Sequence, residues 1–498
     1  MSAGEEIRKE RIKKLEKLAE NKINPYPAKV AFALTEIASA KLNFKKLATK
    51  NPKPIGIAGR ILAKRGHGGI MFLDIFDGSN SLGGSTAKLQ VFAAEDKMGK
   101  ENYSLLQETI DVGDFVAVWG KPFYTKRKEP TIEAEKWQML SKSLRPLPEK
   151  WHGLVDVEER FRKRYLDILM NGEVKEKAVV RSKIVSALRS FLDSEGFLEV
   201  ETPVLQTLAG GTSARPFKTH HNALDIDLNL RIALEIHLKQ LLVGGLPKVY
   251  EMGRIFRNEG IDATHNPEFT MLEAYAAYWD EEQLMKFIEK LTGELAKTVS
   301  KNKAIVFGEN KISFKPPFKR INFFDALERY AMIMDYGKKS RDEIVTIALR
   351  FGLNPEPHDS KGKIADKIFA KVCRPKLINP TFVMNYPVEI FPLAKRSEKN
   401  PGMVIAFQLI AGGIELVKAF NELNDPIDQR ERFKKELENK EKGDYEAQPM
   451  DEEFIEALEY GMPPAAGFGI GIDRLVMLLT NTDNVKEIIL FPTMKPRQ

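Results

Sequence analysis

The segment from Val249 to Tyr278, VYEMGRIFRNEGIDATHNPEFTMLEAYAAY, constrains the fold more than any other part of the chain. Two runs with alternating positions and many apolar or aromatic residues, 249–257 and 268–278, flank a loop rich in Gly, Asp, Asn and Pro. This pattern predicts an antiparallel hairpin with a long loop. Strand residues of equal parity share a face, so Phe269, Glu273 and Tyr275 are expected to lie together.

The predicted hairpin presents a cation, an aromatic ring and carboxylates on one face. Arg257 and Glu259 share parity on the first arm, as Phe269 and Glu273 do on the second. Burying unpaired charges is costly unless a partner or a ligand compensates them. A ligand that carries both a phosphate and an ammonium group would satisfy this face. A solvated hairpin with surface ion pairs is the alternative that the segment alone leaves open.

Composition limits the class of protein. The chain of 498 residues is long enough for about two to four domains. Its single cysteine, Cys373, excludes an internal disulfide framework and argues against a cysteine-based zinc site. There is no run of about 18 apolar residues and the amino terminus is charged from Glu5 onward, so we expect a cytosolic protein without a membrane span. The net charge of +7 is a modest hint of a polyanionic partner.

Short strand patterns dominate the region from Pro54 to Leu144, and a helical stretch near Tyr103 lies between the third and the fourth. This order predicts an OB-type β-barrel, a fold that commonly binds single-stranded nucleic acid or oligosaccharide. The stretch from Gly78 to Thr86 is predicted to be a hairpin tip. Four strand residues could contact unpaired bases, although ordinary barrel residues would need no such role: Arg60, Phe72, Gln90 and Glu135.

A basic amphipathic helix is predicted between Arg8 and Lys22, and it could pack on the protein or contact nucleic acid. A proline-containing linker begins at Leu144 and indicates a domain boundary. We therefore expect a basic helix and lead-in over residues 1–50, an OB-fold domain over 51–145 and a larger domain over 146–498.

A second hairpin is predicted over 406–410 and 414–422. Lys418, Phe420 and Glu422 share parity, whereas Glu415 needs a bulge or a place at the start of its strand. Near the carboxyl end, a Gly-rich strand enters an amphipathic helix that carries Arg474. A dinucleotide fingerprint would require glycine at position 472, and no GxxxxGK[ST] loop occurs, so any use of ATP does not involve a P-loop.

Three of these segments together resemble the motifs of class II aminoacyl-tRNA synthetases. The helix over 174–195 and the strand through Pro203 resemble motif one, FRNE with HNPEFTMLEAY resembles motif two, and GIGIDR resembles motif three. Further stretches resemble the lysyl-tRNA synthetase family in particular: RFRKRYLDIL, ARPFKTHHNALD, LRIALEIHLKQL, FNELNDPIDQR and ILFPTMKP.

The resemblance implies an α+β chain in which an OB-fold barrel that reads the anticodon precedes a class II catalytic domain, an antiparallel sheet flanked by helices. It also implies a homodimer that acts as a lysine–tRNA ligase, with ATP, L-lysine and tRNA(Lys) as partners and Mg²⁺ as cofactor. The basic balance of the chain agrees with a tRNA partner.

The resemblance implies roles for individual residues by motif position. Arg257, Glu259 and Arg474 would be catalytic, with Arg257 on the α-phosphate and the lysine carboxylate. Phe269 and Arg474 would enclose the adenine, and the ATP site would be completed by Glu259, His265, Asn266 and Glu415. Lysine would be bound by Gly211, Glu235, Arg257, Glu273, Tyr275, Lys418, Phe420, Glu422 and Gly469. The anticodon would contact Arg60, Phe72, Gln90 and Glu135, and the metal Gln408 and Glu415.

The physical chemistry of lysine agrees with these roles. Selecting an ammonium at the end of an aliphatic chain calls for an apolar slot that ends in carboxylates. Glu235, Glu273 and Glu422 could supply the carboxylates and Phe420 a wall of the slot. Activation needs no protein nucleophile, because the lysine carboxylate itself attacks the α-phosphorus and expels pyrophosphate.

Two positions depart from the pattern of the family. Gln408 stands where the first of two metal-binding glutamates is usual, which leaves Glu415, and Lys418 stands where an asparagine usually contacts lysine. Glutamine brings no charge, so we predict a weaker or rearranged Mg²⁺ site. Lys418 could pair with the lysine carboxylate or with a phosphate, or it could repel the substrate ammonium.

Three alternatives remain at this point. The aspartyl and asparaginyl enzymes share the architecture, but the acidic pocket argues against them because an aspartate side chain requires a cation. A protein-lysylating relative lacks the OB domain that this chain has. A non-catalytic RNA-binding protein would not need the retained Arg257, Glu259, Phe269 and Arg474.

Overall fold

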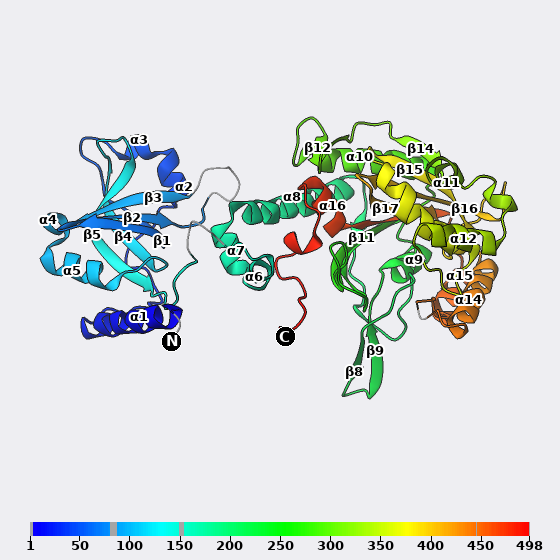
Figure 1. Cartoon of the computed structure of the whole chain (residues 1–498), viewed down its shortest axis with the longest axis horizontal. Helices are drawn as coiled ribbons and strands as arrows, with labels where there is room; N and C mark the ends of the chain where they lie inside the picture. The colour runs from blue at the N-terminus through cyan, green and yellow to red at the C-terminus, as the bar shows by residue number, and fades with distance from the viewer. Residues whose placement is uncertain (1–2, 80–86, 149–153, 445, 498) are drawn as a thin grey trace. The chain divides into compact units, whose positions relative to one another are not determined.

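The computed structural model describes residues 3–79, 87–148, 154–444 and 446–497, so most of the predicted hairpin tip at 78–86 lies outside the described residues. The chain divides into two compact units, Met1–Glu176 and Lys177–Gln498. The first holds a β-barrel and the second a large sheet flanked by helices (Figure 1). This division falls within α8 (Gly172–Ser194), and the expected domain boundary after residue 145 stays a prediction.

The first unit contains the predicted OB-type barrel. Its five strands close in the order β1-β2-β3-β5-β4. Ile57, Leu73 and Val91 are fully buried in its interior, as alternate positions of strands that face a closed core should be. The elements are β1 (Ile55–His67), β2 (Ile70–Phe76), β3 (Lys88–Ala94), α4 (Glu95–Met98), α5 (Lys100–Thr109), β4 (Phe115–Tyr124) and β5 (Pro130–Ser141).

The predicted basic helix is α1 (Ala3–Glu20), and it packs on the barrel. Leu18 is fully buried, and the Arg11 guanidinium donates to the carbonyl oxygens of Ser143 and Val112 at 2.9 Å each. Packing on the body is therefore confirmed. The other helices wholly inside this unit are α2 (Ile37–Leu42), α3 (Phe44–Leu47), α6 (Val157–Arg162) and α7 (Arg164–Met170).

The second unit is built on an eight-stranded sheet in the order β14-β15-β16-β17-β18-β11-β10-β6. Both predicted hairpins are present in it, as β10–β11 and β16–β17. The edge pairs β14–β15 and β10–β6 are parallel, so the expected antiparallel sheet is mixed. The strands are β14 (Lys319–Asn322), β15 (Thr381–Pro387), β16 (Met403–Ala411), β17 (Ile414–Asn421), β18 (Ala465–Gly471), β11 (Glu268–Ala277), β10 (Lys248–Phe256) and β6 (Leu198–Glu199).

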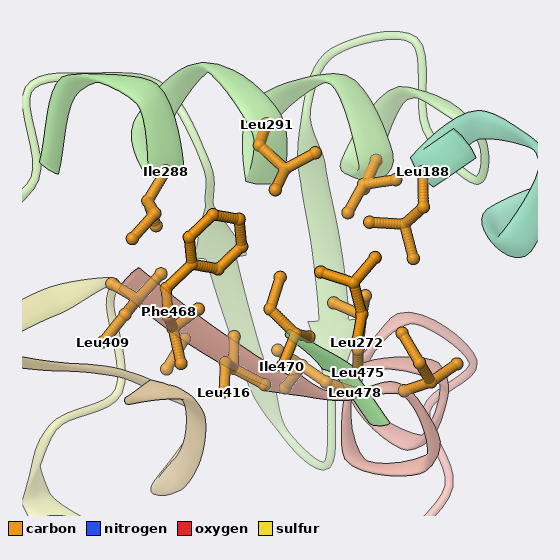
Figure 2. Close-up of a cluster of buried hydrophobic side chains, with 14 of the residues drawn as sticks. Leu188, Leu272, Ile288, Leu291, Leu409, Leu416, Phe468, Ile470, Leu475 and Leu478 are labelled. Carbon is orange, nitrogen blue, oxygen red and sulfur yellow. The ribbon is translucent and has the colours of Figure 1, made fainter. Parts of the chain in front are cut away.

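One face of the sheet packs on a layer of helices. Figure 2 shows Ile288 and Leu291 of α10 (Glu281–Lys297) directed at Phe468 and the neighbouring side chains of the sheet. The same apolar cluster includes residues of α8 and α16 (Ile472–Leu479). Asp280 and Gln283 form a capping box that fixes the start of α10.

The opposite face packs on a second apolar cluster, which contains Leu238, Phe323 and Phe433. The helices on this side are α9 (Glu235–Val243), α11 (Phe323–Ala331), α12 (Arg341–Arg350), α13 (Lys361–Ile368), α14 (Pro426–Glu441) and α15 (Glu452–Glu459). Smaller sheets join β7 (Leu205–Gln206), β9 (Ile226–Leu230) and β8 (Lys218–His221), and β12 (Ala304–Phe307) with β13 (Asn310–Ser313). Short 3-10 helices occur at Tyr336–Lys338, Arg374–Lys376, Val388–Ile390 and Val485–Glu487, and a π-helical segment at Phe369–Cys373.

Within the described residues, every helix is too short or too polar to cross a bilayer.

Candidate active site

A cavity of about 840 Å³ opens on the sheet face opposite α10. Its floor comes from β11, β17 and β18, through Phe269, Glu273, Lys418, Phe420 and Gly469. All the predicted ATP-binding residues and all the predicted lysine-binding residues except Glu422 line this cavity. Segments far apart in the sequence thus meet in one place.

Strand β11 separates core from cavity by parity. Leu272, Ala274 and Ala276 are buried in the cluster that faces α10, whereas Phe269, Glu273 and Tyr275 line the cavity. Alternate residues of β11 therefore lie in different environments. One face of the strand packs on the apolar core, and the other faces the cavity. The prediction that these three residues share a face is confirmed.

One end of the cavity carries cations beside an aromatic ring. The Arg257 guanidinium lies 5.1 Å from the centroid of the Phe269 ring, and its Nε donates to the Ile232 carbonyl oxygen at 3.4 Å. Burial lowers the pKa of Arg257, while Glu259 and Glu273 oppose that shift. Among the described residues, Arg257 forms no ion pair with a carboxylate, so its charge is available to an anion.

Arg474 and His265 lie on the same side of the cavity. An Arg474 guanidinium nitrogen is 3.3 Å from His265 Nε2, and His265 Nδ1 contacts Asp262 at 2.8 Å. Asn266 is buried, and its Oδ1 has no hydrogen-bond partner within the described part of the chain. A cationic rim with a flat ring and a free amide oxygen suits a nucleotide.

The other end of the cavity is acidic and holds an internal ammonium. Lys239 is fully buried, and its Nζ lies 2.5 Å from both Glu235 Oε1 and Glu422 Oε2. Glu422 lies behind the cavity wall and not on it. Glu273 accepts hydrogen bonds from the Leu234 amide at 3.2 Å and the Tyr275 hydroxyl at 2.9 Å. Glu235 and Glu422 therefore share one internal cation, and Glu273 has hydrogen-bond donors but no salt bridge among the described residues, so this end can accept a second ammonium.

The pKa values of these groups follow from burial. Burial and the charge of Glu235 raise the pKa of Glu273 to about 7, although its two hydrogen bonds and Arg257 oppose the shift. Burial also raises the pKa of Glu422 against the attraction of Lys239. The pKa of Lys239 is itself raised, since Glu235 and Glu422 outweigh its desolvation. Such perturbed groups in a cleft are typical of a functional site.

Glycines let the backbone approach these carboxylates. A Cβ on Gly467 would lie 2.4 Å from Glu422 Oε1 and from the Tyr275 ring. Gly211 has a φ of +90°, and a Cβ there would meet the Ala233 Cβ at 3.0 Å. The predicted residues Gly211 and Gly469 thus border the acidic end, and Gly467 was missed although it belongs to the same Gly-rich strand.

Lys239 was also missed. Glu235 and Lys239 stand four residues apart on α9, a spacing that normally indicates a surface ion pair. Only the fold shows that this side of α9 faces the cavity wall. An apolar run around the lysine, in EIHLKQLLV, was the signal in the sequence.

Of the two predicted metal ligands, Glu415 lines the cavity and Gln408 does not. A bulge in β17, opposite Leu409 and Ile410, brings Glu415 to the cavity, which confirms the need for a bulge. Gln408 is buried outside the cavity lining, and its Oε1 accepts a hydrogen bond from the Tyr386 hydroxyl at 3.0 Å.

The donor set around Glu415 does not fit a protein-held Mg²⁺. Glu415 lies 3.6 Å from the Arg374 guanidinium, and Lys418 lies on the same strand with its Nζ 4.3 Å from the Phe391 ring centroid. Among the described residues, no three His, Cys, Asp or Glu side chains are placed to hold a metal ion. Mg²⁺ prefers several oxygen ligands with negative charge, and this region offers cations.

The barrel carries a separate aromatic face in the first unit. Phe72 lies 5.0 Å from Phe92, and Phe92 lies 6.2 Å from Phe123, measured between ring centroids, and all three rings are partly exposed. Gln90 is on the neighbouring strand, where its Oε1 accepts from Thr131. Glu135 pairs with Lys121 at 2.9 Å. This face suits stacking of unpaired bases.

Arg60 is not beside Phe72. Its register partner on β2 is Phe76, and its guanidinium donates to the Gly113 carbonyl and lies 4.2 Å from the Phe115 ring centroid. The exposed Arg65 is the register partner of Phe72. A bulge between Ile61 and Ala63 shifts the pairing of β1 with β2 by one residue. Counting residues outward from the turn of the β1–β2 hairpin identifies Arg65 as the residue opposite Phe72.

Comparisons with known proteins match both units. The family of class II tRNA synthetases (D, K and N) matches residues 156–495, and the OB-fold nucleic acid binding domain matches residues 55–140. The chain is similar to the lysine–tRNA ligase of Moorella thermoacetica, with 47% identity over 100% of this chain and 99% of that protein. It is also similar to the lysine–tRNA ligases of Pelotomaculum thermopropionicum (49% identity; 99% and 96% covered) and Carboxydothermus hydrogenoformans (49%; 99% and 98%).

Proposed function

The chain belongs to the lysine–tRNA ligases of the class II tRNA synthetase family, and we propose that its cavity joins L-lysine to ATP and then charges tRNA(Lys). The observation that carries this proposal is the polarity of the cavity. At one end lie the Phe269 ring and Arg257, which forms no ion pair among the residues that the structure describes, and at the other end lie the buried carboxylates around Lys239.

In this proposal the acidic end holds the lysine ammonium and Phe420 borders the methylene chain. The lysine carboxylate then points to Arg257, which also contacts the α-phosphate, while Phe269 and Arg474 enclose the adenine. A carboxylate oxygen forms a bond to the α-phosphorus, and the bond to the bridging oxygen of the β-phosphate breaks, releasing pyrophosphate. Arg257 neutralises charge that develops on the phosphoryl oxygens.

The second step transfers the amino acid. The oxygen of a ribose hydroxyl at the 3′ end of tRNA(Lys) forms a bond to the carbonyl carbon of lysyl-adenylate and passes its proton to a phosphate oxygen of AMP, which leaves with the electrons of the broken carbon–oxygen bond. Mg²⁺ is part of the substrate here, as the complex that ATP phosphates form with it. No step is assigned to an ion held by Gln408 and Glu415. The proposed place of action is the cytoplasm, where charged tRNA feeds translation.

Charging of a tRNA(Lys) transcript with radioactive lysine tests the proposed function. We expect lysine to be attached at the 3′ end in the presence of ATP, and a transcript with an altered anticodon to be charged far more slowly. A tRNA(Asp) transcript with aspartate is the matched control. Aspartylation without lysylation would contradict the proposal.

Lysine binding is expected to depend on pH through Glu273. Its pKa of about 7 means that the free enzyme holds a proton there below neutrality, and the bound ammonium favours the ionised form. Binding therefore releases a proton, and lysine affinity should fall by about tenfold for each pH unit below 7. Calorimetry in two buffers of different ionisation enthalpy measures the released proton.

The folding stability of the unliganded enzyme depends on pH in the opposite direction to its lysine affinity. A raised carboxyl pKa contributes stability that is complete below the unfolded value and is lost as the pH rises through about 7. A lysine affinity that stays constant between pH 5 and pH 6 would contradict the assignment of Glu273 to the ammonium, because a change of about tenfold per pH unit is expected below pH 7.

The aromatic face of the barrel is proposed to read the anticodon. Phe72→Ala is expected to raise the KM for tRNA by about 10- to 100-fold, since base stacking contributes about 1–3 kcal/mol per base. Lysine-dependent pyrophosphate exchange should be unchanged. Tyr124→Ala is the matched control, because that exposed ring packs on Phe44 instead. Equal effects of the two variants on tRNA charging would rule out the proposed face.

We also propose a homodimer. Exposed apolar residues lie on β6, an edge strand of the large sheet, and in the segment that follows it in the sequence: Leu198, Val204, Leu205 and Leu208. An apolar run at an unpaired strand edge favours association with a second copy. Sedimentation at micromolar concentration should give twice the mass of 56.4 kDa, and a monomer at that concentration would contradict the proposal.

A further inference from the structure

A small group of charged residues, the Lys418 cluster, lies at the side of the cavity. It consists of Asp366 on α13, Arg374, and Glu415 and Lys418 on β17. Asp366, Glu415 and Lys418 line the cavity, and Arg374 pairs with Glu415 at 3.6 Å. Asp366 interacts electrostatically with the other three. Two carboxylates are thus balanced by two cations, so the cluster offers no excess negative charge to a divalent ion.

Gln408 does not change this balance. It is the cross-strand partner of Lys418, and its side-chain oxygen is engaged by the Tyr386 hydroxyl at 3.0 Å. Relative to the family pattern given above, Gln408 removes one negative charge and Lys418 adds one positive charge. The two changes lie side by side in the sheet and together supply the charge of one divalent cation.

Lys418 is free to act on a ligand. Its side chain is exposed within the cavity, its Nζ lies over the Phe391 ring at 4.3 Å, and among the described residues it forms no ion pair with a carboxylate. An ammonium that is a compact point charge interacts well with phosphate oxygens. Glu415 and Arg374 are already paired with each other, which leaves Lys418 as the cation of the cluster that lines the cavity.

We propose that Lys418 takes the place of a protein-held Mg²⁺ and neutralises the phosphates of bound ATP. This inference rests on the proposed function, because it requires that ATP occupies the cavity. The enzyme then needs only the Mg²⁺ that ATP carries with it, and the protein itself contributes no metal ligand at Gln408. ATP free of metal should bind nearly as well as the Mg²⁺ complex.

Calorimetry of ATP binding without lysine tests this inference, since no reaction follows. In EDTA, Lys418→Met should weaken ATP binding by at least about tenfold, whereas Lys418→Arg should retain it, as expected for a charge-assisted contact. Lys371→Met is the matched control, because Lys371 is exposed outside the cavity and donates to the Gly352 carbonyl. Equal ATP affinities of the wild type and Lys418→Met in EDTA would overturn the proposal.

Electron paramagnetic resonance with Mn²⁺ gives a second readout. The wild type with ATP should bind one Mn²⁺ per nucleotide, and the double variant Gln408→Glu, Lys418→Asn should bind an additional ion. An additional ion already in the wild type would overturn the inference. Lysine-dependent pyrophosphate exchange in the same samples separates the role of Lys418 from the proposed function. If the wild type catalyses exchange and also binds an additional Mn²⁺, only the role of Lys418 is refuted. If it neither binds ATP nor catalyses exchange, the proposed function itself is refuted.

Discussion

Arg257→Ala is expected to lower the rate of lysine-dependent ATP–pyrophosphate exchange by about 100- to 1,000-fold, the usual cost of removing a preorganised charge from a transition state. Arg257 lies against Phe269 at the nucleotide end, and within the described part of the chain it forms no salt bridge with a carboxylate. Its backbone continues from β10, which fixes its position. The loss should appear mainly in kcat, because charge develops on the phosphoryl oxygens only during the reaction.

Arg254→Ala is the matched control for this prediction. Arg254 lies on the same strand, is exposed and pairs with Glu268 at 3.4 Å. Its loss removes a surface ion pair that contributes little to stability. Thermal unfolding of both variants checks that they remain folded. Exchange rates that fall equally in the two variants would show that Arg257 has no special role in activation.

Glu273→Gln is expected to raise the KM for lysine by about 100-fold or more, while kcat changes much less. The substitution keeps the shape of the side chain and an oxygen that accepts from the Leu234 amide, while the new amide nitrogen donates to the Tyr275 hydroxyl, and it removes the charge that attracts the ammonium. Losing the charged partner of a buried ion pair costs about 2–5 kcal/mol of binding energy. Pyrophosphate exchange at varied lysine concentration measures the KM.

Glu268→Gln serves as the control for Glu273. Glu268 begins the same strand and is exposed outside the cavity. The Glu273 variant should also lose its pH dependence near neutrality, because the titrating group has been removed. A Glu273→Gln enzyme with an unchanged KM and an unchanged pH profile would mean that another carboxylate of the acidic end binds the ammonium.

Parity made much of the site predictable. Phe269, Glu273 and Tyr275 stand at alternate positions of one strand, and a strand has only two faces, so the sequence already separated ligand-facing side chains from core residues such as Leu272. The need for a bulge at Glu415 followed from the same counting. Alternation along the sequence was sufficient to predict which face a side chain occupies wherever the chain forms a regular strand.

Long-range packing was not predictable from one sequence. The sequence alone suggests that Lys239 and Glu235 form an ordinary ion pair on a helix surface. Only the approach of the end of β17 to α9 brings Glu422 into contact with Lys239 as well. The bulge in β1 that sets Arg65 opposite Phe72, and Arg60 opposite Phe76, cannot be located from composition. Gln408 was assigned by its position in a motif, whereas the hydroxyl of Tyr386, on another strand, decides its hydrogen bonding.

The acidic end also explains how a charged substrate can be selected. Lys239 offsets the charge of two buried carboxylates, Glu235 and Glu422, so the folded enzyme avoids the full cost of burying them, and Glu273 remains to attract one more ammonium. A neutral analogue such as norleucine would leave Glu273 without a partner. An analogue that leaves a buried charged group without a partner is rejected more strongly than one that differs from lysine only in size.

Amino-acid-dependent ATP–pyrophosphate exchange, screened with all the standard amino acids, tests the central claim most directly. The polarity of the cavity predicts exchange with lysine and background exchange with every other amino acid, including aspartate and asparagine. Exchange supported by a different amino acid, or no exchange with lysine by a folded enzyme that binds ATP, would contradict the assignment of the acidic end to the substrate ammonium.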